Sequence, residues 1–222
     1  MPRRPHDAAI FDLDGTLVDT ERLMFEAGER VFARHGAQMT HDLFGRILGT
    51  DGPTGRQILA KALPDHDLAA LEEDWHHEIQ TAFDTGIPPR PQALRLLRAL
   101  AAQGLPVAVA TSSGRGGAAR KLAAAGLARY FEVVITADDV TRRKPAPDPY
   151  LLAAARLGVP PERCLAFEDS APGTRSAHAA GMTVVLVPDM TVPPHDHAHH
   201  VAQDLWEGAL MAGMGALLDT PA

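Results

Sequence analysis

Cysteine is almost absent from this sequence, and so are long apolar runs. The single cysteine, Cys164, has no partner for an intramolecular disulfide bond, so nothing calls for an oxidising compartment. The uncharged stretch 99–114 is only 16 residues long and contains Pro106, which is too short and too polar to span a bilayer. Near the N-terminus, Ile10 and Phe11 are followed at once by Asp12, which does not fit a signal peptide. We therefore expect a cytoplasmic protein.

Positive charge is also scarce. Lysine and arginine number 21 against 28 aspartates and glutamates, which gives a formal net charge of −7 with neutral histidines. Nucleic-acid binding depends mainly on cations that neutralise phosphates, and adhesion to an anionic membrane surface depends on basic clusters. We expect neither a nucleic acid nor a membrane as a partner.

Length and composition are those of an ordinary globular protein. The chain has 222 residues, of which 45% are hydrophobic and 22% charged, so disorder, collagen and a bare coiled coil are excluded. At roughly 100–200 residues per domain, this length fits one large domain or one domain with a smaller companion.

Short apolar segments alternate with helical segments over most of the chain. Strands are predicted at Ala8–Phe11, Pro106–Ala110, Val133–Thr136, Cys164–Phe167 and Thr183–Val187. Helices are predicted between them at Gln92–Ala102, Gly117–Ala125, Tyr150–Leu157 and Thr174–Ala180, with a closing helix in Gly208–Leu218. This alternation predicts right-handed βαβ units, and hence an α/β fold with a Rossmann-like parallel sheet.

One block of the chain interrupts this alternation. Between residues 20 and 88 the pattern contains no convincing strand but four helical segments, at Glu21–His35, Asp42–Leu48, Thr54–Leu63 and Leu68–Phe83. The sequence therefore predicts a core domain of residues 1–19 and 89–222, with an inserted α-helical domain at residues 20–88.

Polar residues follow three of the predicted strands directly. These are Asp12 and Asp14 after the first strand, Thr111 and Ser112 after the second, and Glu168 with Asp169 after the fourth. Ligands of open α/β sheets bind outside the carboxyl ends of the strands. The sequence therefore predicts one site that gathers these segments.

The paired aspartates point to metal-assisted acid–base chemistry. Asp12 and Asp14 are two residues apart in an extended segment, so their side chains leave on the same side, and Gly15 then permits a sharp turn. Two carboxylates so close repel each other unless one binds a cation while the other holds a proton. With Glu168 and Asp169 nearby, the predicted ligands are oxygen atoms, and Mg²⁺ is the metal they favour.

Four segments together resemble the motifs of a known family. They occur in the expected order over nearly the whole chain: Phe11–Thr20, Thr111-Ser112, Lys144–Tyr150 and Phe167–Gly173. This arrangement resembles the haloacid dehalogenase-like (HAD) phosphohydrolases. The helical insertion resembles the cap domain of the β-phosphoglucomutase and phosphoglycolate phosphatase group.

The resemblance implies roles for the aspartates. Asp12 would attack phosphorus and become an aspartyl phosphate, while Asp14 would protonate the departing alcohol and later take a proton from water. Mg²⁺ would be held by Asp12, the backbone carbonyl of Asp14 and Asp169, with Glu168 reaching it through water.

It also implies how the phosphoryl group is held. Thr111, with Ser112, and Lys144 would bind the transferring phosphoryl oxygens. Asp12, Glu168 and Asp169 bring a charge of −3 and a phosphomonoester dianion brings −2, so with Lys144 alone the site would carry −4. A divalent cation reduces this to −2, and without it substrate would be repelled by several kcal/mol at an effective dielectric of about 20.

Other interpretations of these residues remain open. The aspartates could form a turn, Glu168-Asp169 and Thr111–Ser113 could cap helices, and Lys144 could lie in a solvated basic loop beside Arg142 and Arg143. The histidines His195, His197, His199 and His200 lie in a proline-rich loop without the fixed spacing of a zinc site.

The insertion holds the candidates for substrate selectivity. The loop Gly45–Gly52 with Arg46, and also Arg56, could bind a second anionic or hydroxyl-rich group of the substrate, although both arginines could equally be solvated. Met24 stands where sugar-phosphate mutases of the group carry a histidine, and methionine cannot transfer a proton.

The sequence therefore predicts a Mg²⁺-dependent phosphatase acting on a small phosphorylated metabolite, a sugar or organic-acid phosphate, as a monomer or small homo-oligomer. The alternatives are a β-phosphoglucomutase-like phosphotransferase and a catalytically silent binding protein.

Overall fold

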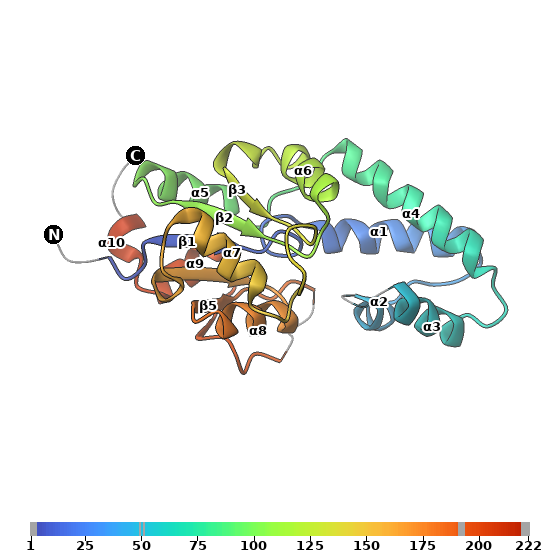
Figure 1. Ribbon diagram of the computed structural model, residues 1–222. Coiled ribbons are helices and arrows are strands. Elements are labelled where there is room, and N and C mark those ends of the chain that lie inside the picture. The colour runs from blue at the N-terminus through green and yellow to red at the C-terminus, as the bar shows by residue number, and fades with distance from the viewer. Residues whose placement is uncertain (1–3, 49, 51, 191–193, 219–222) are drawn as a thin grey trace. The chain divides into compact units, whose positions relative to one another are not determined.

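The chain folds into two compact units, seen in Figure 1. A computed structural model describes residues 4–48, 50, 52–190 and 194–218. The larger unit combines Met1–Asp19 with Pro88–Ala222, and the smaller, helical unit is Thr20–Ile87. No helix within the described ranges is both long and apolar enough to cross a membrane.

The larger unit is built on one parallel sheet. Its strands are β1 (Ala8–Phe11), β2 (Val107–Ala110), β3 (Val133–Ile135), β4 (Cys164–Glu168), β5 (Thr183–Leu186) and β6 (His200–Val201). They lie side by side in the order β3-β2-β1-β4-β5-β6. The α/β class with a parallel sheet, predicted from the alternation of segments, is confirmed.

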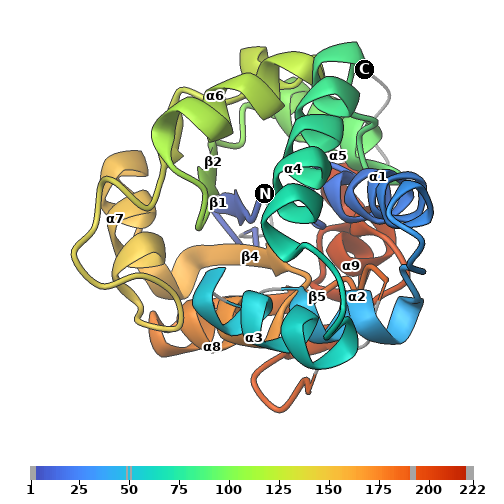
Figure 2. The same ribbon diagram turned by 90° about the vertical axis from the view of Figure 1, so that its right-hand side faces the viewer.

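Helices cover both faces of this sheet. They are α5 (Ala93–Ala102), α6 (Arg115–Ala124), α7 (Asp148–Leu157), α8 (Ala171–Ala179), α9 (Leu205–Met211) and α10 (Gly215–Leu218). On one face, α7 packs on β1, β2 and β3 while α8 packs on β4 and β5. On the other, α9 packs on β5 and β6 and also contacts α5 (Figure 2).

The strand residues are apolar on both faces because both faces are covered. Ile10 and Ala166 belong to a buried cluster with Tyr150 of α7. On the opposite face the rings of Phe11 and Phe167 stack, with centroids 4.9 Å apart. The core thus extends directly beneath the carboxyl ends of β1 and β4.

The strand order defines where a ligand can bind. The chain adds β2 and β3 on one side of β1, then crosses over and adds β4, β5 and β6 on the other. In such sheets the crevice lies where the order reverses, outside the carboxyl ends of the strands. Here that switch point lies between β1 and β4.

The helical unit contains α1 (Thr20–Arg34), α2 (His41–Ile47), α3 (Gly52–Ala62) and α4 (Leu68–Thr85). Thr40 caps α2 by accepting from the Leu43 amide, and Asp67 caps α4 by accepting from the amides of Ala69 and Ala70. The described part of this unit is all-helical, as expected.

The structure adds one strand that was not predicted, and two predicted helices differ most from their expected bounds. The histidine-rich loop contains the short strand β6, which pairs with β5, and a strand of two residues shows no periodicity. The predicted closing helix in Gly208–Leu218 is two helices, α9 and α10, because the chain turns at Gly213 with φ of 81°. Helix α8 begins at Ala171 instead of Thr174, since the Ser170 side chain caps it there.

Two histidines of the larger unit, His6 and His199, should make stability sensitive to acid. His6 is buried, and desolvation lowers its pKa below 6.5; burial and the neighbouring His178 likewise lower the pKa of His199. The unfolded chain therefore binds more protons than the folded chain, so stability is full above pH 6.5 and falls as the pH drops below it.

We expect urea midpoints to fall between pH 7.5 and pH 5.5, and to fall less in His6→Asn than in the parent protein. His77→Asn replaces an exposed histidine of α4 and should keep the parental pH dependence. If the urea midpoint of His6→Asn fell with pH as steeply as that of the parent protein, this histidine would not be the cause of the acid sensitivity.

Candidate functional site

Asp12 is held at the switch point by the register of the central strands. Phe11 lies opposite Phe167, and the Asp12 amide donates to the Phe167 carbonyl at 2.9 Å. Asp12 and Glu168 therefore leave neighbouring strands at the same level. The turn that follows runs through Gly15, whose φ of 77° falls in the left-handed region that glycine adopts readily.

Lys144 joins the two carboxylates. Its ammonium donates to Asp12 Oδ1 at 2.6 Å and to Glu168 Oε1 at 2.5 Å. The lysine side chain is only 4% exposed and the Glu168 side chain is fully buried. The alternative that Lys144 lies in a solvated basic loop is therefore wrong.

Glu168 is tied by further hydroxyl groups. Tyr150 donates to Oε1 at 2.6 Å, and Ser170 donates to Oε2 at 3.1 Å. The carboxylate is thus fixed from three sides, as a buried charge requires. Ser170 also accepts from the Gly173 amide, so Glu168 belongs to a network that includes the start of α8.

One lysine does not balance the charge of this cluster. Burial, followed by the negative charge of Glu168, raises the pKa of Asp12 to about 7, while Lys144 opposes the rise. Burial alone would lower the pKa of Lys144, but Asp12 and Glu168 outweigh it and raise that pKa. The lysine stays charged, and a further cation near Asp12 would favour the ionised form of that carboxylate.

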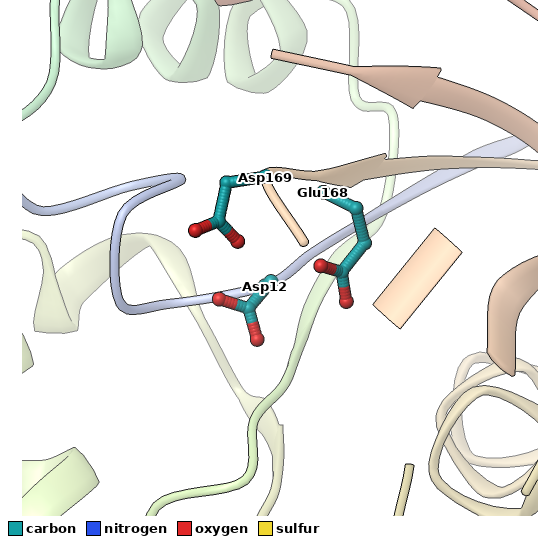
Figure 3. Close-up of side chains that lie close together, drawn as sticks. All are labelled: Asp12, Glu168 and Asp169. Carbon is teal, nitrogen blue, oxygen red and sulfur yellow. The ribbon is translucent and has the colours of Figure 1, made fainter. Parts of the chain in front are cut away.

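Three carboxylates, which we call the acidic triad, supply a place for that cation. Asp12, Glu168 and Asp169 each offer one oxygen, and these oxygens lie within 4.8 Å of one another (Figure 3). The Thr16 hydroxyl donates to Asp169 Oδ1 at 3.3 Å and helps to orient it. The triad with Lys144 sums to −2, and its donors are all oxygen. The residues fit a hard divalent cation.

Asp14 points to different partners. Lys121 donates to Asp14 Oδ1 at 2.6 Å, and Ser113 donates to Asp14 Oδ2 at 2.8 Å. Its side chain is about a third exposed, whereas Asp12 is buried. The two aspartates, two residues apart in sequence, thus have separate environments.

The Thr111–Ser113 segment follows β2 as predicted, and its side chains differ in exposure and partners. Thr111 is buried and its Oγ1 accepts from the Ser113 amide at 3.0 Å. Ser112, selected from the sequence as a phosphate ligand, is exposed, and Ser113 is the serine that contacts Asp14.

Arg46 and Arg56 lie in the helical unit, where each has an acidic neighbour. Arg46 is 3.8 Å from Asp42, and Arg56 is 3.0 Å from Glu72; both arginine side chains are more than half exposed. Arg56 lines a pocket of about 380 Å³ inside that unit. Positions 49 and 51 of the predicted substrate loop lie outside the described residues.

Met24 lines the same pocket, and its backbone carbonyl accepts from the Trp75 indole at 3.0 Å. Its thioether cannot transfer a proton, and the prediction from the sequence that disfavours a mutase therefore still stands as a prediction.

Two participants escaped sequence reasoning. Tyr150 ends the predicted third motif and begins a predicted helix, but the sequence assigns no role to its hydroxyl group, which bonds to Glu168. Lys121 lies in the last turn of α6, where a lysine is common for local reasons, so no local pattern distinguishes it.

Two of the loop histidines, His197 and His199, pack against His178 of α8. The His178 ring centroid lies 5.3 Å from that of His197 and 5.6 Å from that of His199. His199 Nδ1 accepts from the Val184 amide at 3.0 Å, beside the β5–β6 pairing.

Gly173 should be indispensable for the geometry of Glu168. A Cβ at this position would lie 1.9 Å from Glu168 Oε2 and 2.0 Å from Oε1. We expect Gly173→Ala to lower the free energy of unfolding by about 1–3 kcal/mol, since a buried carboxylate must move away from its donors. Gly117→Ala in α6 meets nothing within 4 Å and is the matched control for urea unfolding. Equal stability of the two variants would contradict the prediction.

The chain is similar to a known protein family and to several known proteins. The profile of a family described as haloacid dehalogenase-like hydrolase matches residues 9–187. A phosphorylated carbohydrates phosphatase of Thermotoga maritima is 37% identical over 177 residues, which cover 79% of this chain and 82% of that protein. The fructose-1-phosphate phosphatase YqaB of Escherichia coli is 36% identical over 181 residues, covering 80% and 94%.

A solved structure extends the similarity to the fold. The HAD family hydrolase from Deinococcus radiodurans R1, with bound phosphate and sodium, is 31% identical. It superposes with a TM-score of 0.84 and covers 99% of this chain and 100% of its own.

Proposed function

Because the chain belongs to the haloacid dehalogenase-like hydrolases, we propose that it hydrolyses small phosphomonoesters through an aspartyl phosphate formed on Asp12. The observation that carries this proposal is the position of Asp12. It lies buried at the switch point of the sheet, with Lys144 at 2.6 Å and two further carboxylates beside it. A buried carboxylate placed there can act as a nucleophile.

In the first half of the reaction, Asp12 attacks phosphorus and the ester oxygen leaves. An alkoxide is a poor leaving group, so a general acid must supply a proton. Asp14 is two residues from the nucleophile and has a separate environment, which suits it to this role. In the second half, Asp14 takes a proton from the water that attacks the aspartyl phosphate.

Lys144 and Thr111 stabilise the charge on the transferring group. Lys144 stays protonated and carries the positive charge closest to Asp12, so we assign it to the phosphoryl oxygens. Thr111 follows the neighbouring strand β2 and supplies a buried hydroxyl group near the same end of the sheet.

The acidic triad would hold the divalent cation, for which we propose Mg²⁺. Asp12, the backbone carbonyl of Asp14 and Asp169 are the direct protein ligands in this assignment. Glu168 already accepts from Lys144, Tyr150 and Ser170 and acts mainly by positioning the lysine. When bound, the cation supplies electrostatic stabilisation of the phosphoryl oxygens.

The substrate class follows from the relatives and the site chemistry. The two relatives compared above are named as phosphatases of phosphorylated carbohydrates and of fructose 1-phosphate. We propose a sugar phosphate as substrate, with a phosphorylated organic acid as the alternative. We also propose that the helical unit Thr20–Ile87 is the cap domain.

Phosphate release measures the proposed activity directly. Purified protein with Mg²⁺ is offered p-nitrophenyl phosphate and then hexose phosphates, pentose phosphates and phosphorylated hydroxy acids. We expect inorganic phosphate from p-nitrophenyl phosphate and a preference among the sugar phosphates. Absence of phosphate release from every compound would refute the proposal. Stimulation by an added sugar bisphosphate, with phosphate retained in the product, would indicate a mutase instead.

A further inference from the structure

We propose that Lys121 is a positioning residue that, together with Ser113, fixes the Asp14 carboxyl group for proton transfer to the leaving group. This inference rests on the proposed phosphatase function. Its evidence is three contacts that join Asp14 after β1, Ser113 after β2 and Lys121 of α6.

Both oxygens of Asp14 are held. Lys121 donates to Oδ1 at 2.6 Å and Ser113 donates to Oδ2 at 2.8 Å. Lys121 also donates to Ser113 Oγ at 3.0 Å, which closes the triangle. The terminal torsion of an aspartate is otherwise broad, so two donors on opposite oxygens select one orientation of the carboxyl plane.

The Lys121–Asp14 pair differs from an ordinary surface ion pair. The Lys121 side chain is 17% exposed and that of Asp14 is 31% exposed. By contrast, the i,i+4 pair Arg22–Glu26 has side chains that are 46% and 40% exposed. An exposed ion pair contributes little to holding a side chain in place, whereas the partly buried Lys121 side chain holds the Asp14 carboxyl group in one position.

The position of Lys121 in α6 allows its side chain to reach Asp14. The helix starts at Arg115, directly after the Thr111–Ser113 segment, and Lys121 lies in its last turn. The side chain reaches back to the carboxyl end of β1 instead of extending along the helix. One segment thereby supplies Ser113 and Lys121 to the same aspartate.

A comparison of two substrates tests this role. p-Nitrophenolate is a stable anion at neutral pH and leaves without a proton, whereas an alkoxide needs one. The ratio kcat/KM covers the steps up to departure of the leaving group. We expect Lys121→Met to lower kcat/KM for an alkyl phosphomonoester by about 10²-fold, the scale set by a misplaced general acid. For p-nitrophenyl phosphate we expect a change of less than about threefold.

Controls separate positioning from folding and from charge. Lys61→Met removes an exposed lysine of α3 and should leave kcat/KM unchanged for both substrates. Lys121→Arg should recover part of the loss, and Ser113→Ala should show the same selectivity with a smaller effect. Because Ser113→Ala removes only a hydroxyl group, it tests the same triangle if Lys121→Met fails to fold.

A double-mutant cycle decides whether Lys121 acts through Asp14. In an Asp14→Asn background, Lys121→Met should cause no further selective loss. Equal losses on both substrates, or an undiminished loss in that background, would overturn the inference, as would unchanged kcat/KM on the alkyl ester. Failure of the parent protein to hydrolyse p-nitrophenyl phosphate would instead count against the proposed function.

Discussion

The Asp12→Asn variant should lose turnover by at least about 10³-fold on every phosphomonoester, because an amide is not a competent nucleophile for phosphorus. The side chain keeps its size and still offers an acceptor to Lys144, which now donates at 2.6 Å. We therefore expect the fold to survive. The measurement is phosphate release under saturating substrate, with unfolding monitored on the same preparation.

The chemistry of the intermediate gives a second readout of this variant. Parent protein quenched in acid during turnover should carry an acid-stable, hydroxylamine-sensitive acyl phosphate, and Asp12→Asn should carry none. Asp65→Asn, an exposed aspartate of the helical unit, is the control for removing one negative charge. Normal turnover by Asp12→Asn would mean that another group attacks phosphorus.

The sequence predicted the sheet and the place of the site because both depend on local patterns. Apolar segments such as Ala8–Phe11 end abruptly in acidic residues, and parallel strands bring their carboxyl ends to one edge. The convergence of Asp12 with Glu168, 156 positions apart in the chain, therefore followed from strand pairing alone. The charged environment of Lys144 also followed, through the motif it belongs to.

The remainder depends on tertiary geometry that local patterns do not contain. The turn between β2 and α6 decides which serine reaches Asp14, and this serine is Ser113. Lys121 and Tyr150 both lie on helices, and only helix placement against the sheet aims them at carboxylates. Strand β6 exists because β5 offers an edge to pair with.

Removal of divalent cations should reduce turnover to background, and added Mg²⁺ should restore it. The physical reason is the charge of the site: the acidic triad with Lys144 carries −2, and a phosphomonoester dianion adds −2. At an effective dielectric of about 20, charges of this size a few ångströms apart repel by several kcal/mol, which is enough to prevent substrate binding. The measurement is phosphate release in excess EDTA, followed by titration with MgCl₂.

A binding readout independent of turnover makes this prediction sharper. A cation that binds only the folded protein stabilises it, by about 2.7 kcal/mol at a concentration one hundred times its Kd, so Mg²⁺ should raise the melting temperature. Asp169→Asn removes a triad carboxylate that Lys144 does not contact, so it should weaken the Mg²⁺-dependent shift while leaving the Lys144 contacts in place. Full activity in EDTA would exclude a metal-dependent mechanism. If Mg²⁺ raised the melting temperature of Asp169→Asn as much as that of the parent protein, the cation would bind somewhere other than the acidic triad.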